Sequence, residues 1–113
     1  MALPSRGEVW FADLGQNPGL EQGKRRPTLV VSVDRFNHAR IGLVVIVPIT
    51  TTIRNIPMHI EAFPPDGGLK HHSCIQCDQP RCVSRKRLVD RIGCVCRETM
   101  EQVEDRLRIL LDL

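Results

Sequence analysis

The stretch EVWFADLGQNPGLEQGKRRPTLVVSV, residues 8–33, places two apolar, β-branched runs on either side of a polar link. The runs at 7–14 and 27–33 each predict a β-strand, because branched and aromatic residues fit a pleated, half-buried surface. The link, residues 15–26, is long for a hairpin, and structured loops of this kind are typically functional or mobile. Proline is permitted at the first position of a strand, which predicts that the second strand opens at Pro27.

The middle of the chain predicts further short strands separated by turns. Residues 34–42 indicate a turn or short helical piece, and the uninterrupted apolar run at 43–49 predicts a strand buried on both faces. Two more strands are expected at 56–63 and 71–79, with residues 80–84 as a short continuation of the second.

Two helices are expected after the strands. Ser84 can cap a brief helix over 85–92 that ends at Gly93. The last segment, 97–113, predicts a helix with one apolar face, formed at three- and four-residue steps by Met100, Val103, Leu107, Leu110 and Leu111. Five or more short strands and two helices predict a mainly β (α+β) fold. We expect a strongly bent antiparallel sheet or open barrel with one helix against an end or flank.

The bulk composition fits an ordinary globular protein. The length of 113 residues suits one domain, spanning 1–113, with one core. The formal net charge is +3, and Arg supplies thirteen of the sixteen cations. Guanidinium forks match phosphate oxygens two at a time, although an Arg excess also reflects base composition in some genomes. There is no apolar run of about 18 residues and no secretory signal, so a cytoplasmic location is expected.

The cysteines and histidines leave a metal site open. The five cysteines are Cys74, Cys77, Cys82, Cys94 and Cys96, an odd number that argues against a disulfide framework. The CIQC segment has zinc-knuckle spacing, with His71 and His72 close in sequence. In a strand, however, Cys74 and Cys77 point to opposite faces, which favours buried small side chains over zinc ligands. Adjacent imidazoles likewise point apart, so neither these histidines nor His59 are expected to be catalytic.

The Gly23-Lys24 dipeptide resembles a phosphate-binding P-loop, but its surroundings do not fit that motif. A P-loop requires glycine where Pro18 stands, and Ser or Thr where Arg25 stands. The link also leads into a strand, so no helix N-terminus faces the anion. A P-loop is therefore excluded.

Arg26 and Thr50 are better candidates for contacting phosphate. Pro27 restricts the residue before it to extended geometry, so Arg26 loses less entropy in presenting its guanidinium than an arginine on a free loop. Thr50 follows the apolar run, where its hydroxyl can donate to a phosphate oxygen. Taken alone, such residues are more often a solvated surface cation and an ordinary strand end.

A series of motifs along the whole chain favours functional roles for Arg26 and Thr50. Along the chain the sequence carries RGEVWFADL, GLEQG, RRPTLVVS, VPITT, CDQPR and SRKRL. In this order and spacing they resemble the MazF/PemK family of toxins from bacterial toxin–antitoxin pairs, from Arg6 to the final helix. The resemblance implies a small SH3-like antiparallel β-barrel with a C-terminal helix, as in MazF, PemK and CcdB, paired into a homodimer.

The same resemblance implies metal-independent, sequence-specific cleavage of single-stranded RNA, which inhibits translation and needs no cofactor. The family's essential arginine falls on Arg26, its threonine on Thr50 and a loop glutamate on Glu21, the three expected catalytic residues. Attack by the 2′-hydroxyl would leave a 2′,3′-cyclic phosphate and a 5′-hydroxyl. Arginine does not deprotonate readily in proteins, so the general base stays open, with Glu21 as one choice.

Residues around this centre are expected to bind RNA, namely Gln22, Lys24, Arg25, Thr51, Arg54 and Arg81. The family also implies a cognate antitoxin, whose acidic, flexible peptide would lie in a cationic groove. Two departures from the family pattern are Leu20, in place of a loop serine, and Pro80, in place of a β-branched residue. Both bear on which RNA sequence is chosen more than on catalysis.

Two alternatives come from other functional classes. One is a non-enzymatic toxin of the same fold that binds a protein such as gyrase, although the chain ends LLDL and lacks the Trp-Gly-Ile ending of those toxins. The other is a zinc-bearing RNA- or protein-binding module without catalysis, for which the cysteines would supply the ligands.

Overall fold

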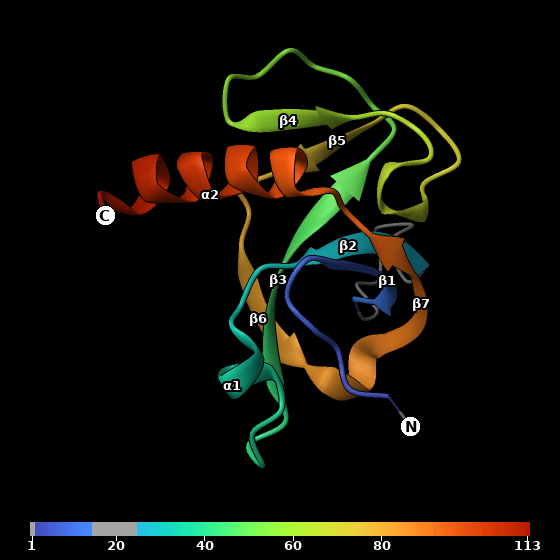
Figure 1. The fold of residues 1–113 in the computed structure, drawn as a ribbon, viewed down its shortest axis with the longest axis vertical. Helices are drawn as coiled ribbons and strands as arrows, with labels where there is room; N and C mark the ends of the chain where they lie inside the picture. Colours follow the sequence, from blue (N-terminus) through green and yellow to red (C-terminus); the bar gives the residue numbers. More distant parts are fainter. Residues whose placement is uncertain (1, 15–24) are drawn as a thin grey trace, which may run out of the picture.

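Residues 2–14 and 25–113 are described by the computed structural model, whose fold is shown in Figure 1. Its strands are β1 (Glu8–Asp13), β2 (Arg25–Val30), β3 (Leu43–Thr50), β4 (His59–Ala62), β5 (Ser73–Gln76), β6 (Arg81–Ser84) and β7 (Leu88–Cys94). Its helices are α1 (Asp34–Asn37) and α2 (Arg97–Leu111), with the short 3₁₀ turns η1 (Asp66–Gly68) and η2 (Arg85–Arg87). The fold is therefore mainly β with a C-terminal helix, as predicted. None of the helices in residues 2–14 and 25–113 is long and apolar enough to cross a membrane.

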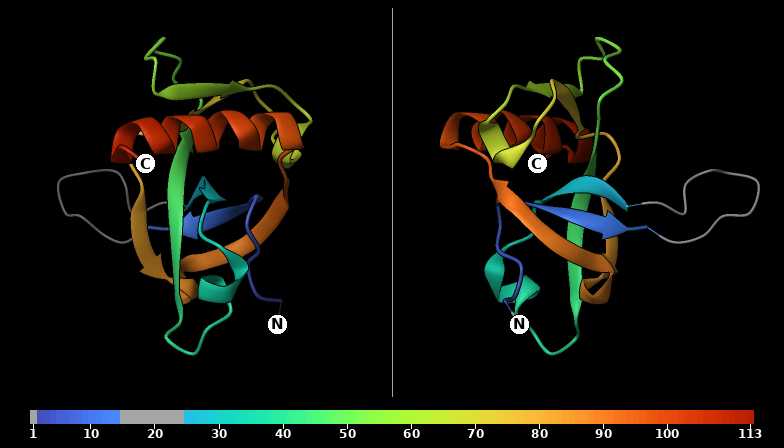
Figure 2. Two further views of the ribbon diagram at one scale, coloured as in Figure 1. Left: turned by 60° about the vertical axis from the view of Figure 1, so that its left-hand side comes forward. Right: turned by 90° about the vertical axis from the view of Figure 1, so that its right-hand side faces the viewer.

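The strands form one bent antiparallel sheet in the order β4-β5-β3-β2-β1-β7, with β6 also paired to β3. The long strand β3 serves two neighbours in succession, because residues 43–46 lie opposite β6 while Ile49 and Thr50 lie opposite β5. Strands β6, β3, β2, β1 and β7 curl around a common interior, and β5 and β4 continue beyond the end of β3 (Figures 1 and 2). In the described chain no ladder joins β6 to β7, so the barrel is open.

Alternate residues of β1, β2 and β3 supply two cores, one on each face of the bent sheet. The core inside the barrel contains Trp10, Ala12, Val30, Val44, Ile46, Val83 and Leu88. The core between the barrel and the outer elements includes Val9, Leu29, Val47, Ile49, Ile60, Ile75, Met100 and Val103. Neighbouring residues of β3 face different cores, which confirms the predicted burial of its apolar run on both faces.

Helix α2 covers the outer core and lies between the β4–β5 pair and the barrel (Figures 1 and 2). Met100 and Val103 are buried in that core and Leu107 packs against it, which confirms the predicted apolar face at these positions. Leu110 and Leu111 continue the same face of α2 but are 41% and 56% exposed. The helix extends past the strands that it covers, so its last turn has no partner within the described residues (Figure 1).

The predicted helix over 85–92 is wrong. Ser84 does act as a cap, since its Oγ accepts a hydrogen bond from the Lys86 N–H at 3.2 Å, but only the single turn η2 follows. The chain then forms β7, which pairs with β1 and buries Leu88 inside the barrel. Pairing with β1 and this burial therefore override the local helix pattern.

Gly93 does not end a helix but allows two backbones to touch. A Cβ atom on Gly93 in β7 would lie 2.7 Å from the carbonyl oxygen of Gly67 in η1. Gly68 has φ of +75°, and a Cβ there would lie 2.5 Å from the carbonyl oxygen of Ile92. Because neither position has room for a side chain, η1 packs directly on β7.

Two other strands differ from the predictions. β6 is a separate strand rather than a continuation of β5, because β5 ends at Gln76 and the chain turns through a hydrogen bond from Gln79 N–H to Gln76 O at 3.1 Å. β6 then begins at Arg81, against the other half of β3. β4 is shorter than predicted, since a hydrogen bond from His59 N–H to Ile56 O at 2.9 Å turns the chain immediately before it.

Candidate functional site

Strand β2 begins at Arg25 rather than at Pro27, so both arginines that precede the proline lie inside the strand. The ladder with β1 already holds them, with Arg25 opposite Asp13 and Arg26 opposite Ala12. The ladder with β3 begins only at Thr28, directly after Pro27, whose nitrogen carries no hydrogen to donate. The start of β2 is therefore paired on one side only.

Arg26 and Thr50 lie on the same face of the sheet, at the ends of neighbouring strands. Thr28 lies opposite Pro48, and two further residues along each strand lead to Arg26 on β2 and Thr50 on β3. Side chains alternate along a strand, so both share the face of the Thr28–Pro48 pair. They flank the place where the β2–β3 ladder has stopped.

Both side chains keep hydrogen-bonding capacity at this place. Arg26 is half-buried, and in residues 2–14 and 25–113 no hydrogen bond or ion pair engages its guanidinium. The half-buried Thr50 accepts a hydrogen bond at Oγ1 from the Thr52 N–H at 3.1 Å, which leaves the hydroxyl proton available as a donor. Together they can present a cationic fork and a hydroxyl to one anion.

The other predicted substrate-binding residues divide between the two faces. Arg81 lies opposite Ile46 at the start of β6, on the face that carries Arg26 and Thr50. Arg25 lies on the opposite face and pairs with Asp90 of β7, with Nη1 and Oδ2 3.3 Å apart. Thr51 follows β3 at an exposed position, and the exposed Arg54 lies farther along the loop to β4.

Part of the predicted site lies outside the described residues. This part holds the predicted catalytic Glu21 and the predicted RNA-binding residues Gln22 and Lys24, together with most of the predicted link at 15–26. Their roles therefore stay predictions.

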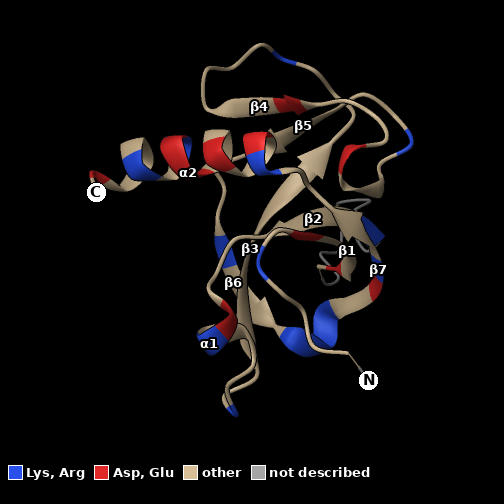
Figure 3. Ribbon diagram, viewed as in Figure 1, with Lys and Arg blue, Asp and Glu red and all other residues tan. Residues whose placement is uncertain are grey.

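Several other arginines are engaged in structural contacts. Figure 3 shows Lys and Arg gathered at η2, at one end of the barrel. There Arg85 donates from Nη1 to the carbonyl oxygens of Asn37 and Ala39, both at 2.7 Å. Arg6 forms an ion pair with Glu104 at 2.9 Å. Such contacts distinguish these cations from Arg26.

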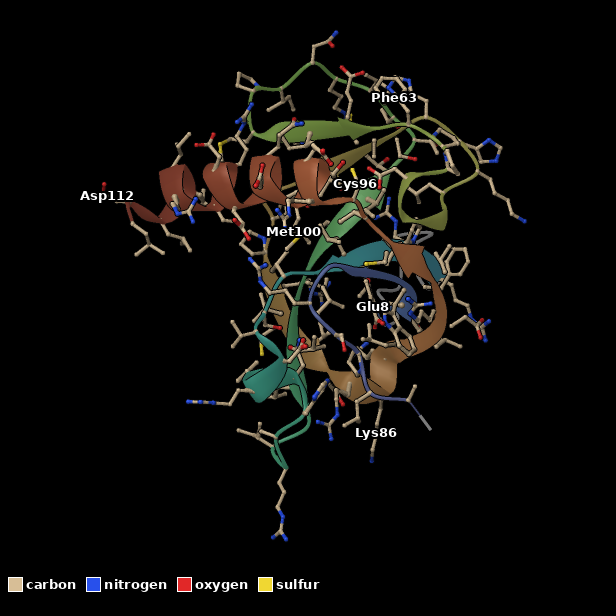
Figure 4. All side chains as sticks on the ribbon, viewed as in Figure 1. Glu8, Phe63, Lys86, Cys96, Met100 and Asp112 are labelled. Atoms are coloured by element: carbon tan, nitrogen blue, oxygen red, sulfur yellow. The ribbon has the colours of Figure 1, made fainter. Side chains whose placement is uncertain are left out.

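Glu8, which stands in the RGEVWFADL motif, is a structural carboxylate (Figure 4). Its Oε1 accepts hydrogen bonds from Trp10 Nε1–H at 3.0 Å and from Ser5 N–H at 2.8 Å, and Oε2 lies 2.8 Å from Arg91 Nε. Burial raises the pKa of the Glu8 carboxyl, but these hydrogen bonds and the Arg91 charge outweigh burial and lower the pKa overall. Glu8 therefore ties β1 to β7 as an anion.

Three of the four histidines, His59, His71 and His72, lie in different environments. His59 is buried, with Nε2 3.1 Å from Asp78 Oδ1 and with no partner for Nδ1 among the described residues. His72 stacks on Phe63, with ring centroids 4.4 Å apart. His71 lines a different surface, next to Ser73, which confirms that the two adjacent imidazoles point apart.

The five cysteines divide into two buried and three exposed thiols. Cys74 and Cys77 are buried, as predicted, whereas Cys82, Cys94 and Cys96 are exposed, so the prediction of buried side chains is wrong for these three. Burial raises the pKa of the Cys77 thiol to about 12. Across the described ranges, no group of three or more His, Cys, Asp or Glu side chains could hold a metal ion.

Two hollows adjoin these elements. One of about 530 Å³ lies between β4 and α2 and includes the carboxylates of Glu61 and Asp66 in its lining. Neither Arg26 nor Thr50 lines it. The other, of about 330 Å³, includes Phe11, Pro27, Thr51, Lys70, His71 and Ser73 in its lining. Apart from Thr51, none of these residues is a predicted substrate-binding residue, because they come from segments that only the fold brings together.

Comparison with known proteins yields full-length matches. The sequence profile of a family described as PemK-like, MazF-like toxin of type II toxin–antitoxin system matches residues 5–111. The chain is 36% identical to endoribonuclease EndoA from Bacillus subtilis, over 98% of this chain and 97% of the relative. A solved endoribonuclease in complex with its cognate antitoxin, from Mycobacterial species, is 32% identical with a TM-score of 0.79, covering 97% of this chain and 96% of that chain. A chain of a MazE–MazF crystal structure from Deinococcus radiodurans is 24% identical, covers 100% of this chain and 99% of its own length, and confirms the fold with a TM-score of 0.86.

Proposed function

The chain belongs to the PemK-like, MazF-like toxin family of type II toxin–antitoxin systems, and from that premise we propose that it cleaves single-stranded mRNA and so inhibits translation. It is an endoribonuclease toxin, like the EndoA relative, whose length it matches almost completely. Cleavage is sequence-specific and needs neither a metal ion nor another cofactor.

The position of Arg26 relative to Thr50 is the observation that carries this proposal. The two side chains share a face at the point where β2 and β3 part, and within the described residues no ion pair neutralises the guanidinium. A phosphodiester placed there meets a bidentate donor from one strand and a hydroxyl donor from the next. Such donors, fixed by strands, need little reorganisation when negative charge develops.

RNA supplies its own nucleophile, so the protein has to align and stabilise rather than attack. The 2′-oxygen forms a bond to phosphorus, its proton passes to a base, and the bond from phosphorus to the 5′-oxygen breaks as that oxygen gains a proton. Arg26 holds the nonbridging oxygens as their charge grows, and Thr50 donates a further hydrogen bond. Glu21 is our choice for accepting the first proton, because an arginine retains its proton.

Substrate binding extends from this centre to further residues on both faces of the sheet. Arg81 lies on the face of Arg26 and Thr50, where its planar guanidinium can stack on a base or meet a phosphate. The remaining residues that we propose to contact RNA are Gln22, Lys24, Arg25, Thr51 and Arg54. The products are a 2′,3′-cyclic phosphate and a 5′-hydroxyl.

The protein acts as a homodimer that a cognate antitoxin neutralises. The mycobacterial relative is an endoribonuclease in complex with its cognate antitoxin, which supports such a partner. An acidic, flexible antitoxin peptide would compete with RNA for the cationic groove. We place the protein in the cytoplasm, where mRNA is translated. Its five free cysteines accord with a reducing compartment.

The test is to incubate the purified protein with a long RNA in EDTA and to map both new ends at each cut. We expect cuts at one short sequence, with cyclic phosphate at the upstream end and hydroxyl at the downstream end. A 5′-phosphate at the cuts, or activity that EDTA removes, would contradict the mechanism. Intact RNA together with inhibited DNA gyrase would favour the non-enzymatic alternative.

A further inference from the structure

The pocket of about 330 Å³ lies on the opposite face of the sheet from Arg26 and Thr50. Two of its lining residues are nevertheless their neighbours in the chain. Pro27 directly follows Arg26, and Thr51 directly follows Thr50, and both line the pocket. The residue that directly follows each proposed catalytic residue in the chain therefore lines this pocket. A nucleotide that adjoins a phosphate held at the strand ends can therefore turn its base into the pocket.

The pocket offers the groups that recognise a splayed-out base. Phe11 is 37% exposed and presents an aromatic ring, and Pro27, its ladder partner on β2, adds an apolar wall. In the described part of the chain the Thr51 hydroxyl has no hydrogen-bond partner, so it is free to meet a base edge. Single-stranded RNA is read by stacking on aromatic rings together with hydrogen bonds to base edges.

The charges at the two hollows favour the smaller one for RNA. Lys70 and His71 line the pocket of about 330 Å³, and its described lining contains no carboxylate. The larger hollow, between β4 and α2, presents the two carboxylates Glu61 and Asp66 together with Arg106. Lysine attracts the phosphates that accompany a base, whereas carboxylates repel them.

We infer that this pocket receives the base of a nucleotide adjoining the scissile phosphate, and that Phe11 and Thr51 contribute to the choice of RNA sequence. The inference rests on the proposed function and adds to it a specificity-determining site. A peptide's apolar side chain is the other occupant that such a pocket could take. The base is favoured because the Thr51 hydroxyl, which no described residue engages, and the neighbouring Arg26–Thr50 pair serve a nucleotide and not an apolar group.

The test combines protein variants with altered substrates. Oligonucleotides that contain one mapped cut site carry an abasic nucleotide at each flanking position in turn, and kcat/KM is measured for each. Wild type is expected to lose roughly 5- to 150-fold at one position, the range that base stacking supplies. Phe11→Leu removes the ring but keeps an apolar side chain. Its kcat/KM on intact RNA falls by a similar factor, whereas on that abasic substrate its kcat/KM equals that of wild type. Thr51→Val changes the preference among the four bases at the same position.

Matched controls and outcomes keep this inference separate from the proposed function. Thr52→Val, at the next residue, leaves the base preference unchanged, and thermal unfolding checks that each variant folds. If Phe11→Leu does not fold, Thr51→Val at its exposed position carries the test.

One outcome overturns the pocket assignment but leaves the proposed nuclease function in place. In it, wild type cuts intact RNA, and Phe11→Leu lowers kcat/KM by the same factor on every abasic substrate as on intact RNA. Loss of antitoxin binding with unchanged cleavage would assign the pocket to a peptide and also overturn the inference. If wild type cuts no RNA, the proposed function and the inference fail together.

Discussion

Arg26 and Thr50 lie on adjacent antiparallel strands, each two residues beyond the Thr28–Pro48 pair and on the same face of the sheet. The β2–β3 pairing stops at Thr28 and Pro48, so Arg26 and Thr50 lie beyond the last paired residues of the two strands. Thr50 lies opposite Cys74 of β5, which anchors the end of β3. Both side chains are therefore carried on backbones that strand pairing fixes, Arg26 by β1 and Thr50 by β5.

The hydroxyl of Thr50 is expected to act as a donor in the transition state. Thr50→Val keeps the branched shape but removes the hydroxyl, and should lower the single-turnover cleavage rate by about 10²–10³. Thr50→Ser keeps the donor and should stay within about tenfold of wild type. Thr52→Val is the matched control. A valine variant as fast as the serine variant would exclude this role.

The sequence was informative where pattern and pairing agree, as at β3. Its apolar run predicts burial on both faces, and the two cores on either side of the strand confirm it. The prediction of a helix over 85–92 is wrong, because most of this segment forms β7, which pairs with β1. A single-sequence pattern describes near neighbours in the chain, whereas β7 is fixed by residues on the first strand.

Gly93 is expected to be essential for stability. Gly93→Ala places a Cβ against the carbonyl of Gly67, 2.7 Å away, and should lower the free energy of unfolding by about 1–3 kcal/mol through overpacking. Urea unfolding measures the change. Val89→Ala, at an exposed position on the same strand, should cost about 0.5 kcal/mol or less. Equal stability of the Gly93 variant and the control would contradict the close approach of η1 to β7.

Glu8 is expected to make stability depend on pH in the acid range. The folded state lowers the pKa of Glu8 below its ordinary value of 4.5, so the stabilisation is complete above that value and is lost as the pH falls through the lowered pKa. Glu8→Gln should lower the free energy of unfolding by roughly 1–3 kcal/mol at neutral pH. The difference from wild type should shrink in acid. A difference that stays constant with pH would show that the carboxylate charge is not responsible.

The thiols are expected to react according to exposure. Iodoacetamide at neutral pH should label Cys82, Cys94 and Cys96 in the folded protein. Cys77 should stay unlabelled, because it is buried and its pKa is raised to about 12. Peptide mapping by mass spectrometry identifies the labelled sites, with urea-unfolded protein as the control in which all five cysteines react. Labelling of Cys77 at the rate of Cys82 would contradict its burial.

The candidate site was predictable only in part. The motif RRP and the threonines after the apolar run single out Arg26 and Thr50, and the fold then places both on one face. The pocket beside them had no such signal. Phe11 and His71 lie in two separate predicted strands, and Lys70 directly precedes the second. The fold of η1 against β7 brings all three near Pro27.

The single-turnover cleavage rate of Arg26→Ala tests the central claim most directly. The variant should keep the wild-type thermal unfolding curve while cutting RNA at least about 10²-fold more slowly, because the bidentate donor to the transition state is lost. Arg40→Ala, at an exposed arginine outside the site, should cut at the wild-type rate. A folded Arg26→Ala protein that cuts as fast as the Arg40 control would contradict the account.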